Sequence, residues 1–171
     1  GPNARLMVAY AQGHKETVQL VNEAAGKLGV GVDALNSTLG RTLCRTLESV
    51  LVARQLEKWF AALQERIRSG DCATFNPDRW EPESWPKSAQ GVGFTEAARG
   101  TLSHWVEIDN GRISRYQCVV PSTWNSSGRD PEGQRGPFEH ALAAGGSHPL
   151  QDPERPLEVL RTVHSFDPCQ S

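Results

Sequence analysis

LNSTLGRTLCRTLESVLVARQLEKWFAALQERI, residues 35–67, is the stretch that decides the fold class. Its apolar residues recur at spacings of three and four, which predicts one helix of roughly 35 residues. Asp33 or Ser37 is expected to cap its start, and Gly70 stands where a helix commonly terminates. One helix cannot bury such a stripe alone, so we expect a multi-helix bundle whose other helices lie elsewhere in the chain or outside it. The stripe comprises Leu35, Leu39, Leu43, Leu47, Val50, Leu51, Leu56, Trp59, Phe60, Leu63 and Ile67.

The flanking segments add shorter elements. Residues 14–28 have helical spacing, residues 71–93 have the prolines and charges of a loop, and short helices are predicted near 138–144 and 157–163. Two extended runs, 101–108 and 112–120, flank Asp109-Asn110-Gly111, a strong hairpin signal. The predicted fold class is mainly α with a small β-hairpin or sheet (α+β). We expect a helical segment at 1–70, a loop, pocket turn and hairpin at 71–125, and a loop with short helices at 126–171.

Composition narrows the classes of function. The 171 residues are 37% hydrophobic, enough for one packed domain or part of a larger one. The formal charge of −2 argues against nucleic acid as the main partner, and no apolar run approaches the length of a membrane helix. The sequence begins with neither an initiator Met nor a signal peptide, so any export is expected to depend on a removed segment or a partner. The four cysteines form no CxxC pair, which favours free thiols or a metal role over disulfides.

Three short motifs contain side chains suited to chemistry. In Asp167-Pro168-Cys169 the proline restricts the backbone before a soft sulfur ligand, although an isolated tripeptide of this kind is more often an inert cysteine near a terminus. Residues 91–100 are interpreted as a glycine-flexed turn that presents Glu96 and Arg99, either to a ligand or to each other. Residues 119–125 end the second extended run in hydroxyls and an amide, a pattern that simple turn chemistry also explains.

The remaining cysteines and histidines are weaker candidates. Cys44 lies on or near the helical stripe and is expected in the core, whereas Cys72 lies in a loop. His104 and His164 have apolar neighbours in the sequence and are interpreted as core histidines. No HExxH or GxSxG motif is present, so zinc hydrolases and serine hydrolases have no support.

Four ordered motifs nevertheless resemble one family. GVGFTEAARGTLSHW (91–105), YQCVVPSTWN (116–125), QRGPFEHAL (134–142) and LEVLRTVHSFDPC (157–169) are similar in order and spacing to the C-terminal half of [NiFe] hydrogenase large subunits. The opening GPNARL and the long helical stretch are also similar, so the resemblance covers essentially the whole chain. The last motif looks most like the respiratory uptake branch. The implied fold is part of the multi-helix bundle of that subunit.

The resemblance implies heterolytic cleavage of dihydrogen at a nickel–iron centre. In the family, four thiolates hold nickel, and the iron carries cyanide and carbon monoxide. Cys169 matches a terminal nickel ligand that also takes up a proton. Arg99 matches a guanidinium above the metals that interacts with a cyanide, and Asp167 matches the carboxylate that fixes its pose. Because a guanidinium is a very weak acid, Arg99 and Cys169 both stay candidates for the base.

Other positions follow individually from the resemblance. Ser122 matches a hydroxyl that donates to the second cyanide, with Pro121 and Val120 lining the pocket. The backbone carbonyl of Cys118 matches a ligand of magnesium or another hard cation. Ala98 stands where the family usually has proline, which is expected to loosen the backbone before Arg99.

The implied partners are dihydrogen, the N-terminal part of the large subunit and a small subunit that holds the Fe–S clusters, because this chain has no cluster motif. Membrane contact is expected only through partners. The expected location is the periplasmic side of a membrane through the small subunit, with the cytoplasm as the alternative. A non-catalytic, hydrogenase-like assembly scaffold is the alternative function. The related quinone-reductase core subunits lack the nickel cysteines, so Cys169 argues against them. Expressed alone, the chain is expected to be inactive.

Overall fold

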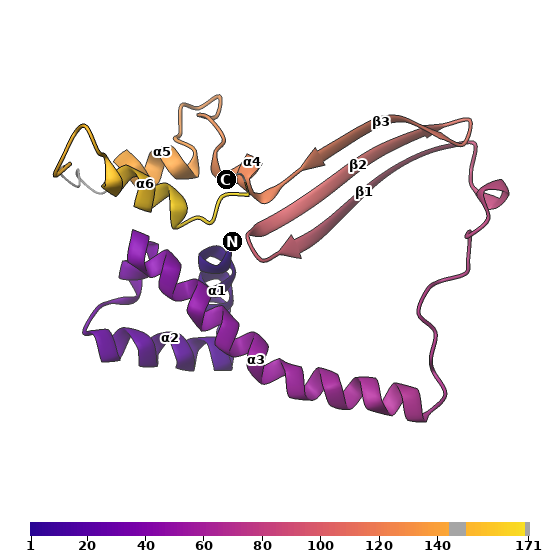
Figure 1. The fold of residues 1–171 in the computed structure, drawn as a ribbon, viewed down its shortest axis with the longest axis horizontal. Coiled ribbons are helices and arrows are strands. Elements are labelled where there is room, and N and C mark those ends of the chain that lie inside the picture. Colours follow the sequence, from indigo (N-terminus) through magenta and orange to yellow (C-terminus); the bar gives the residue numbers. More distant parts are fainter. Residues whose placement is uncertain (144–149, 170–171) are drawn as a thin grey trace.

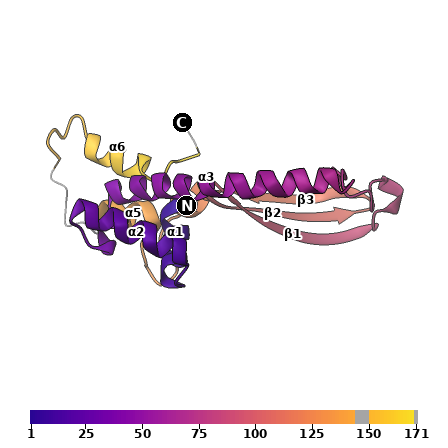
Figure 2. The same cartoon turned by 90° about the horizontal axis from the view of Figure 1, so that it is seen from below.

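The computed structural model describes residues 1–143 and 150–169, arranged in three groups around one junction (Figure 1). Three N-terminal helices form one group, a long three-stranded sheet forms the second, and three short helices form the third. The second view shows the sheet and the far half of α3 extending in the same direction away from the junction (Figure 2). The helices are α1 (Pro2–Ala11), α2 (Lys15–Leu28), α3 (Thr38–Arg68), α4 (Pro121–Asn125), α5 (Pro137–Ala143) and α6 (Leu157–His164), with 3₁₀ turns η1 (Val32–Asn36) and η2 (Pro82–Ser84).

The predicted long helix is confirmed as α3, and its first half contains the core. Ser37, rather than Asp33, caps it by accepting a 3.0 Å hydrogen bond from the Gly40 amide. The helix ends at Arg68, and Gly70 has a φ of +81°. The helix predicted at 14–28 is confirmed as α2. The core of α1, α2, η1 and α3 consists of Leu6, Val21, Leu35, Cys44 and Leu47, which confirms the core position of Cys44.

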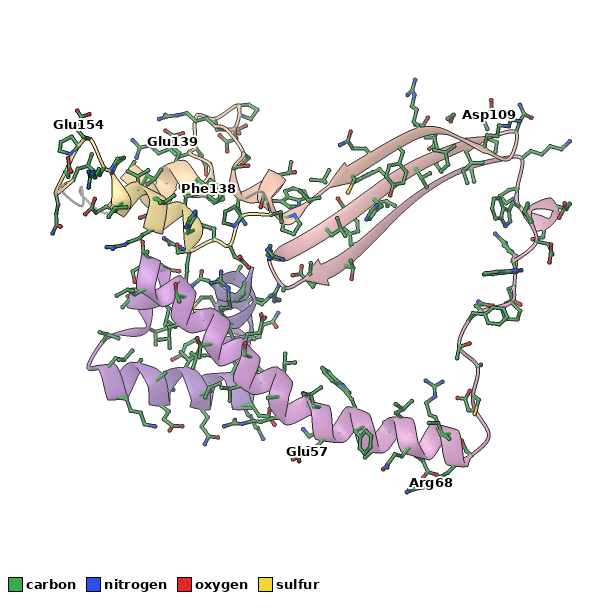
Figure 3. The ribbon with its side chains drawn as sticks, in the orientation of Figure 1. Glu57, Arg68, Asp109, Phe138, Glu139 and Glu154 are labelled. Atoms are coloured by element: carbon green, nitrogen blue, oxygen red, sulfur yellow. The ribbon has the colours of Figure 1, made fainter. Side chains whose placement is uncertain are left out.

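The second half of α3 is exposed in this chain. Leu47 is the last buried position of the helix, although the apolar stripe continues to Ile67. This half projects away from the other helices, and its side chains between the labelled Glu57 and Arg68 have no element beside them (Figure 3). The exposed apolar residues there are Leu56, Trp59, Phe60, Leu63 and Ile67, and near the other end Leu39 is also exposed. Within the described residues, the chain therefore buries only part of the stripe.

The predicted hairpin is confirmed, but the sheet has one strand more than predicted. Strands β2 (Gly100–Asp109) and β3 (Arg112–Val119) pair antiparallel, and Asn110 and Gly111 turn between them with φ of +50° and +72°. Residues 88–97, predicted as loop and turn, form β1 (Ser88–Ala97), which pairs with the whole of β2. Gly91 and Gly93 lack the branched side chains that indicate a strand, and pairing with β2 overrides that local preference.

The C-terminal segments pack back on α3. Residues 121–125, interpreted as the end of a strand, instead form the short helix α4 with Pro121 at its first turn. The helices predicted near 138–144 and 157–163 are confirmed as α5 and α6, with residue 144 outside the described residues. Arg41 of α3 donates to Ser165 Oγ at 2.7 Å and lies 4.3 Å above the Phe166 ring, which docks the end of α6.

The core interpretation of the two histidines is wrong for His164 and only partly right for His104. His164 is exposed at the end of α6, so its apolar neighbours in sequence do not surround it in space. His104 is half-buried on the sheet, where its ring contacts the Tyr116 hydroxyl across β2 and β3. Neither histidine is therefore fully buried. No helix among the described residues is both long and apolar enough to cross a bilayer.

Candidate active site

The tight turn between β1 and β2 presents Arg99 to the C-terminal segment. Ala97 and Gly100 are the last paired residues of the two strands, so Ala98 and Arg99 form the turn itself. Arg99 Nε lies 3.2 Å from Asp167 Oδ2, and Arg45 Nε of α3 lies 3.9 Å from the same oxygen. The side chains of Arg99 and Asp167 are 46% and 38% exposed, so this ion pair contributes little to the stability of the fold. Its main effect is to orient the two side chains toward each other.

Asp167 reaches this position because of an unusual backbone conformation. Its φ is +55°, and its amide donates to the His164 carbonyl at 2.9 Å, which closes the turn after α6. Aspartate tolerates this left-handed conformation better than most residues, and Pro168 prevents the helix from continuing. The turn therefore directs the Asp167 carboxylate toward the β1–β2 turn and leads the chain to Cys169.

A second contact holds the backbone at Cys169. The Cys169 amide donates to Ser122 Oγ at 2.7 Å, and Ser122 lies in the first turn of α4 directly after β3. The thiol of Cys169 is free, and the residue is exposed. Two contacts from the sheet side thus hold the three-residue segment Asp167-Pro168-Cys169. Arg99, Asp167, Ser122 and Cys169 therefore lie in one connected set of contacts, and their roles in a metal site stay predictions.

The remaining predicted pocket residues are divided between two hollows. Pro121 is buried and lines a cavity of about 320 Å³ together with Arg99 and Gly100. Val120 and Ser122 line a separate cavity of about 660 Å³, to which Pro168 also contributes. Ala98 is exposed in the turn, and its carbonyl accepts a 2.9 Å hydrogen bond from Arg5. In this chain these residues surround the Asp167–Cys169 segment rather than form one closed pocket.

The Cys118 carbonyl lies in β3, where the Gln117 side chain donates to it at 3.0 Å. Cys118 pairs with His104 of β2 in the sheet register. Among residues 1–143 and 150–169, no group of three or more His, Cys, Asp or Glu side chains is arranged to hold a metal ion. The magnesium assignment of the Cys118 carbonyl stays a prediction.

Arg99 and Ser122 have side-chain donors that their contacts within the described residues leave unused. Ser122 Oγ accepts the Cys169 amide, and across the described part of the chain its own O–H has no protein acceptor. The Arg99 Nη groups likewise have no acceptor among these residues. Two side chains that contact the Asp167–Cys169 segment thus keep unused donors, and the segment carries one exposed soft sulfur; this chemistry fits a thiolate-bound metal with hydrogen-bonding ligands.

Sequence reasoning missed the side chains that support this arrangement. Arg5 of α1 binds the Glu48 carboxylate with two hydrogen bonds of 2.5 and 2.7 Å and also reaches Glu96 at 2.7 Å. Glu96 therefore pairs with Arg5 rather than with Arg99. These partners are 43 and 91 residues from Arg5 in the sequence, and no local pattern indicates pairs at such separations.

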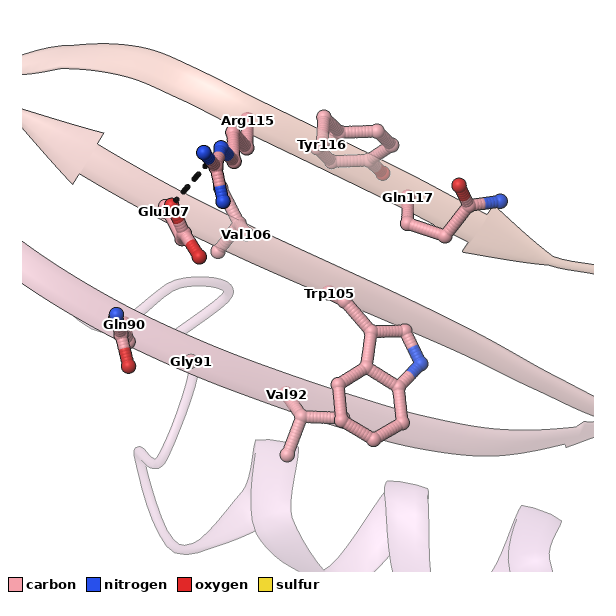
Figure 4. A pocket seen from close by; sticks show the side chains of 9 residues that line it. All are labelled: Gln90, Gly91, Val92, Trp105, Val106, Glu107, Arg115, Tyr116 and Gln117. Carbon is pink, nitrogen blue, oxygen red and sulfur yellow. Dashed lines mark ion pairs between the residues drawn. The ribbon is translucent and has the colours of Figure 1, made fainter.

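A further cavity lies elsewhere, on one face of the sheet (Figure 4). It has a volume of about 760 Å³, and Trp105, Tyr116 and the Glu107–Arg115 ion pair of 3.6 Å line it. None of the predicted site residues contributes to it. The candidate site therefore rests on the contacts around Asp167–Cys169 and not on cavity size.

Several known proteins similar to this chain are hydrogenase large subunits. Residues 1–171 match the family model described as nickel-dependent hydrogenase. The chain is 52% identical over 169 residues to the uptake hydrogenase large subunit of Bradyrhizobium diazoefficiens, covering 99% of this chain and 28% of that protein. It is 47% identical to the hydrogenase-1 large chain of Escherichia coli K12, with the same coverage. The chain thus spans little more than a quarter of the length of these relatives.

Solved structures agree with the sequence comparison. The [NiFeSe] hydrogenase of Dm. baculatum superimposes with a TM-score of 0.65 at 39% identity, covering 81% of this chain and 26% of that one. That of Desulfovibrio vulgaris Hildenborough gives a TM-score of 0.63 at 35% identity, with the same coverage. The chain belongs to the nickel-dependent hydrogenase family, as part of a [NiFe] large subunit of the uptake type.

Proposed function

We propose that this chain provides one side of a nickel–iron centre that cleaves dihydrogen, and that Cys169 is one of the nickel ligands. The observation that supports this most directly is the convergence on residues 167–169. Arg99 contacts Asp167 at 3.2 Å from one turn, and Ser122 accepts the Cys169 amide at 2.7 Å from the start of a helix. Two independent contacts thus hold the segment that carries the exposed Cys169 thiol, and one of them ends on the Arg99 guanidinium.

The nickel–iron centre, when bound, supplies the Lewis acid and electron acceptor for heterolytic cleavage of the H–H bond. Cys169 would hold nickel through Sγ and receive the proton at that atom. Arg99 would direct its unused Nη donors at the metal ligands and favour charge separation there. Asp167 would orient Arg99 through Nε, and Ser122 would donate its free O–H to a second ligand. Pro121 and Val120 would exclude water from this side of the site.

The chain requires partners for this function. In this proposal Cys169 supplies one thiolate, and the other three thiolates of the centre would come from elsewhere in the large subunit. A small subunit with Fe–S clusters would receive the electrons and provide any association with a membrane. The Cys118 carbonyl is retained as the proposed magnesium ligand.

The test uses the full-length large subunit, assembled with its small subunit, carrying Arg99→Lys. Lysine keeps the positive charge but cannot bind Asp167 and a metal ligand with one planar fork. We expect nickel content to stay at the wild-type value and dihydrogen uptake to fall by about 10²-fold or more.

Arg66→Lys is the matched control, because Arg66 forms an exposed 2.8 Å pair with Asp71 at the far end of α3. It should leave uptake unchanged. Wild-type turnover in a fully loaded Arg99→Lys enzyme would remove Arg99 from the reaction.

A further inference from the structure

Arg5 of α1 uses all five of its N–H donors in one cluster. Nε and Nη2 bind the Glu48 carboxylate of α3, and Nη1 binds Glu96 Oε2 of β1 at 2.7 Å. The two remaining donors bind backbone carbonyls, Nη1 to Ala97 at 2.9 Å and Nη2 to Ala98 at 2.9 Å. A guanidinium with every donor satisfied has one well-defined orientation.

The two backbone carbonyls are the last ones before Arg99. Hydrogen bonds to consecutive carbonyls fix the orientation of two consecutive peptide groups, and those groups determine the direction in which the Arg99 side chain leaves the turn. Figure 1 shows this end of the sheet beside α1 and α3, the two helices that supply Arg5 and Glu48. The helical core therefore helps to fix the position of the turn, in addition to the two strands that the turn connects.

The carboxylates of the cluster favour the charged form of Arg5. Its hydrogen bonds with Glu48, followed by those with Glu96, raise the pKa of the Arg5 guanidinium, against the opposing effect of burial. Glu96 also accepts a hydrogen bond from Thr101 of β2, so its carboxylate is held from both sides. The Arg5 side chain is 26% exposed and has no donor left for a ligand.

The same helix also holds the other partner of Arg99. Arg45 lies one turn before Glu48 on α3, and its Nε is 3.9 Å from Asp167 Oδ2. Adjacent turns of α3 thus make two contacts. Glu48 binds Arg5, which holds the backbone before Arg99, and Arg45 contacts Asp167, which pairs with the Arg99 side chain. A shift of the turn relative to α3 would change the Arg99–Asp167 distance.

We propose that Arg5 is a positioning residue for Arg99 and acts on dihydrogen cleavage only through it. This inference rests on the proposed role of Arg99 and names the residue that orients the Arg99 side chain. Lysine at position 5 keeps the charge, but one ammonium cannot bind two carboxylates and two carbonyls at once. Displacement of a catalytic group by about 1 Å can cost up to about 10²-fold in rate.

The experiment is a double-mutant cycle in the full-length, metal-loaded complex with the small subunit. It comprises Arg5→Lys, Arg99→Lys and both together, with Arg66→Lys as the control. We expect Arg5→Lys to retain nickel, to lower kcat by about 10- to 100-fold with little change in KM, and to shift a cyanide infrared band that also shifts in Arg99→Lys. In the Arg99→Lys background the Arg5 change should cost less than threefold, because the group it positions is already absent.

The outcomes separate this inference from the proposed function. If Arg99→Lys turns over like the wild type, the proposed role of Arg99 fails first. If Arg99→Lys is impaired but the Arg5 effect is equally large in both backgrounds, or the infrared bands do not move in Arg5→Lys, the positioning role of Arg5 is overturned alone.

Should Arg5→Lys lose its metals, Glu96→Gln takes its place in the cycle, since it weakens the same cluster while keeping the shape. It should then lower kcat by about twofold to tenfold, again only when Arg99 is present.

Discussion

Asp167 shows how a single residue serves both the backbone and the site. Its left-handed conformation ends α6, and its carboxylate contacts Arg99 and Arg45. The motif around Cys169 and the family resemblance nominated Arg99, Asp167, Ser122 and Cys169 from the sequence, and the structure links them through two contacts. They did not identify Arg5, because its partners come from distant segments. A long-range ion pair leaves no periodic signal that a single sequence can reveal.

Substitution of Asp167 should separate its two roles. Asn tolerates the left-handed conformation but loses the charge, so Asp167→Asn should fold normally, keep nickel and lose about tenfold in uptake rate. Asp167→Ala removes the charge and also places alanine at positive φ, at an additional cost of about 1–2 kcal/mol. Uptake assays and melting temperatures of the assembled enzyme check both variants. Equal melting temperatures for Asn and Ala would contradict the backbone role.

Glu96 gives the cluster a defined pH dependence. The hydrogen bond from Thr101, followed by that from Arg5, lowers the pKa of the Glu96 carboxyl below its usual value. A carboxylate whose folded pKa is depressed contributes stability above its unfolded pKa of about 4.3 and loses it as pH falls through the folded value. Its side chain is half exposed, so the effect is small. Between pH 7 and pH 3 the melting temperature should fall less steeply in Glu96→Gln than in the wild type. Identical slopes would exclude a contribution of Glu96 ionisation to stability.

At the scale of elements, helical periodicity predicted α2, α3 and α6 to within about three residues at each end, the accuracy expected of boundaries inferred from sequence. The hairpin signal of Asn110-Gly111 was equally reliable, because both residues must adopt positive φ there. Strand β1 was missed because Gly91 and Gly93 weaken its strand pattern. Pairing with β2, rather than the local sequence of residues 88–97, makes this segment a strand. The turn at Arg99 therefore lies between two paired strands, of which the sequence indicated only β2.

The contact between α3 and η1 depends on the absence of a side chain at Gly40. A Cβ there would lie 2.3 Å from the Ala34 carbonyl oxygen and 2.4 Å from Leu35 Cα, both of them backbone atoms. Gly40→Ala should therefore destabilise the helical core by about 2 kcal/mol or more. Gly26→Ala in α2 is the matched control, because open space surrounds it, and it should stabilise by up to about 1 kcal/mol. Thermal unfolding of the full-length protein gives both values; equal effects would refute the close approach.

At the scale of the whole molecule, the chain exposes more surface than a compact monomer. Its accessible area is 12676 Å², whereas a folded monomer of 18.7 kDa exposes about 8,300 Å². The exposed half of α3 and the projecting sheet account for this shape (Figures 1 and 2). The sequence predicted that the stripe needs partners but could not locate them, because periodicity reveals a buried face and not what covers it. Since the chain spans about 28% of its relatives' length, we expect the remainder of the large subunit to cover this face.

A charge on the exposed stripe should therefore impair assembly. Trp59→Asp in the full-length large subunit should reduce the yield of the complex with the small subunit by about tenfold or more, because a charge would be buried without a partner. Ala61→Asp introduces the same charge on the opposite side of the helix and should have little effect. Size-exclusion chromatography of the assembled complex provides the comparison. Equal yields of the two variants would show that the Trp59 face stays exposed to solvent.

The most direct test is the nickel content of the full-length complex carrying Cys169→Ala. Loss of this thiolate should reduce bound nickel from about one atom per complex to background and abolish dihydrogen uptake, because the remaining ligands cannot complete the site. Cys72→Ala, which removes an exposed loop thiol, should retain full nickel and activity. Stoichiometric nickel in a folded Cys169→Ala complex would contradict the assignment of Cys169 as a ligand.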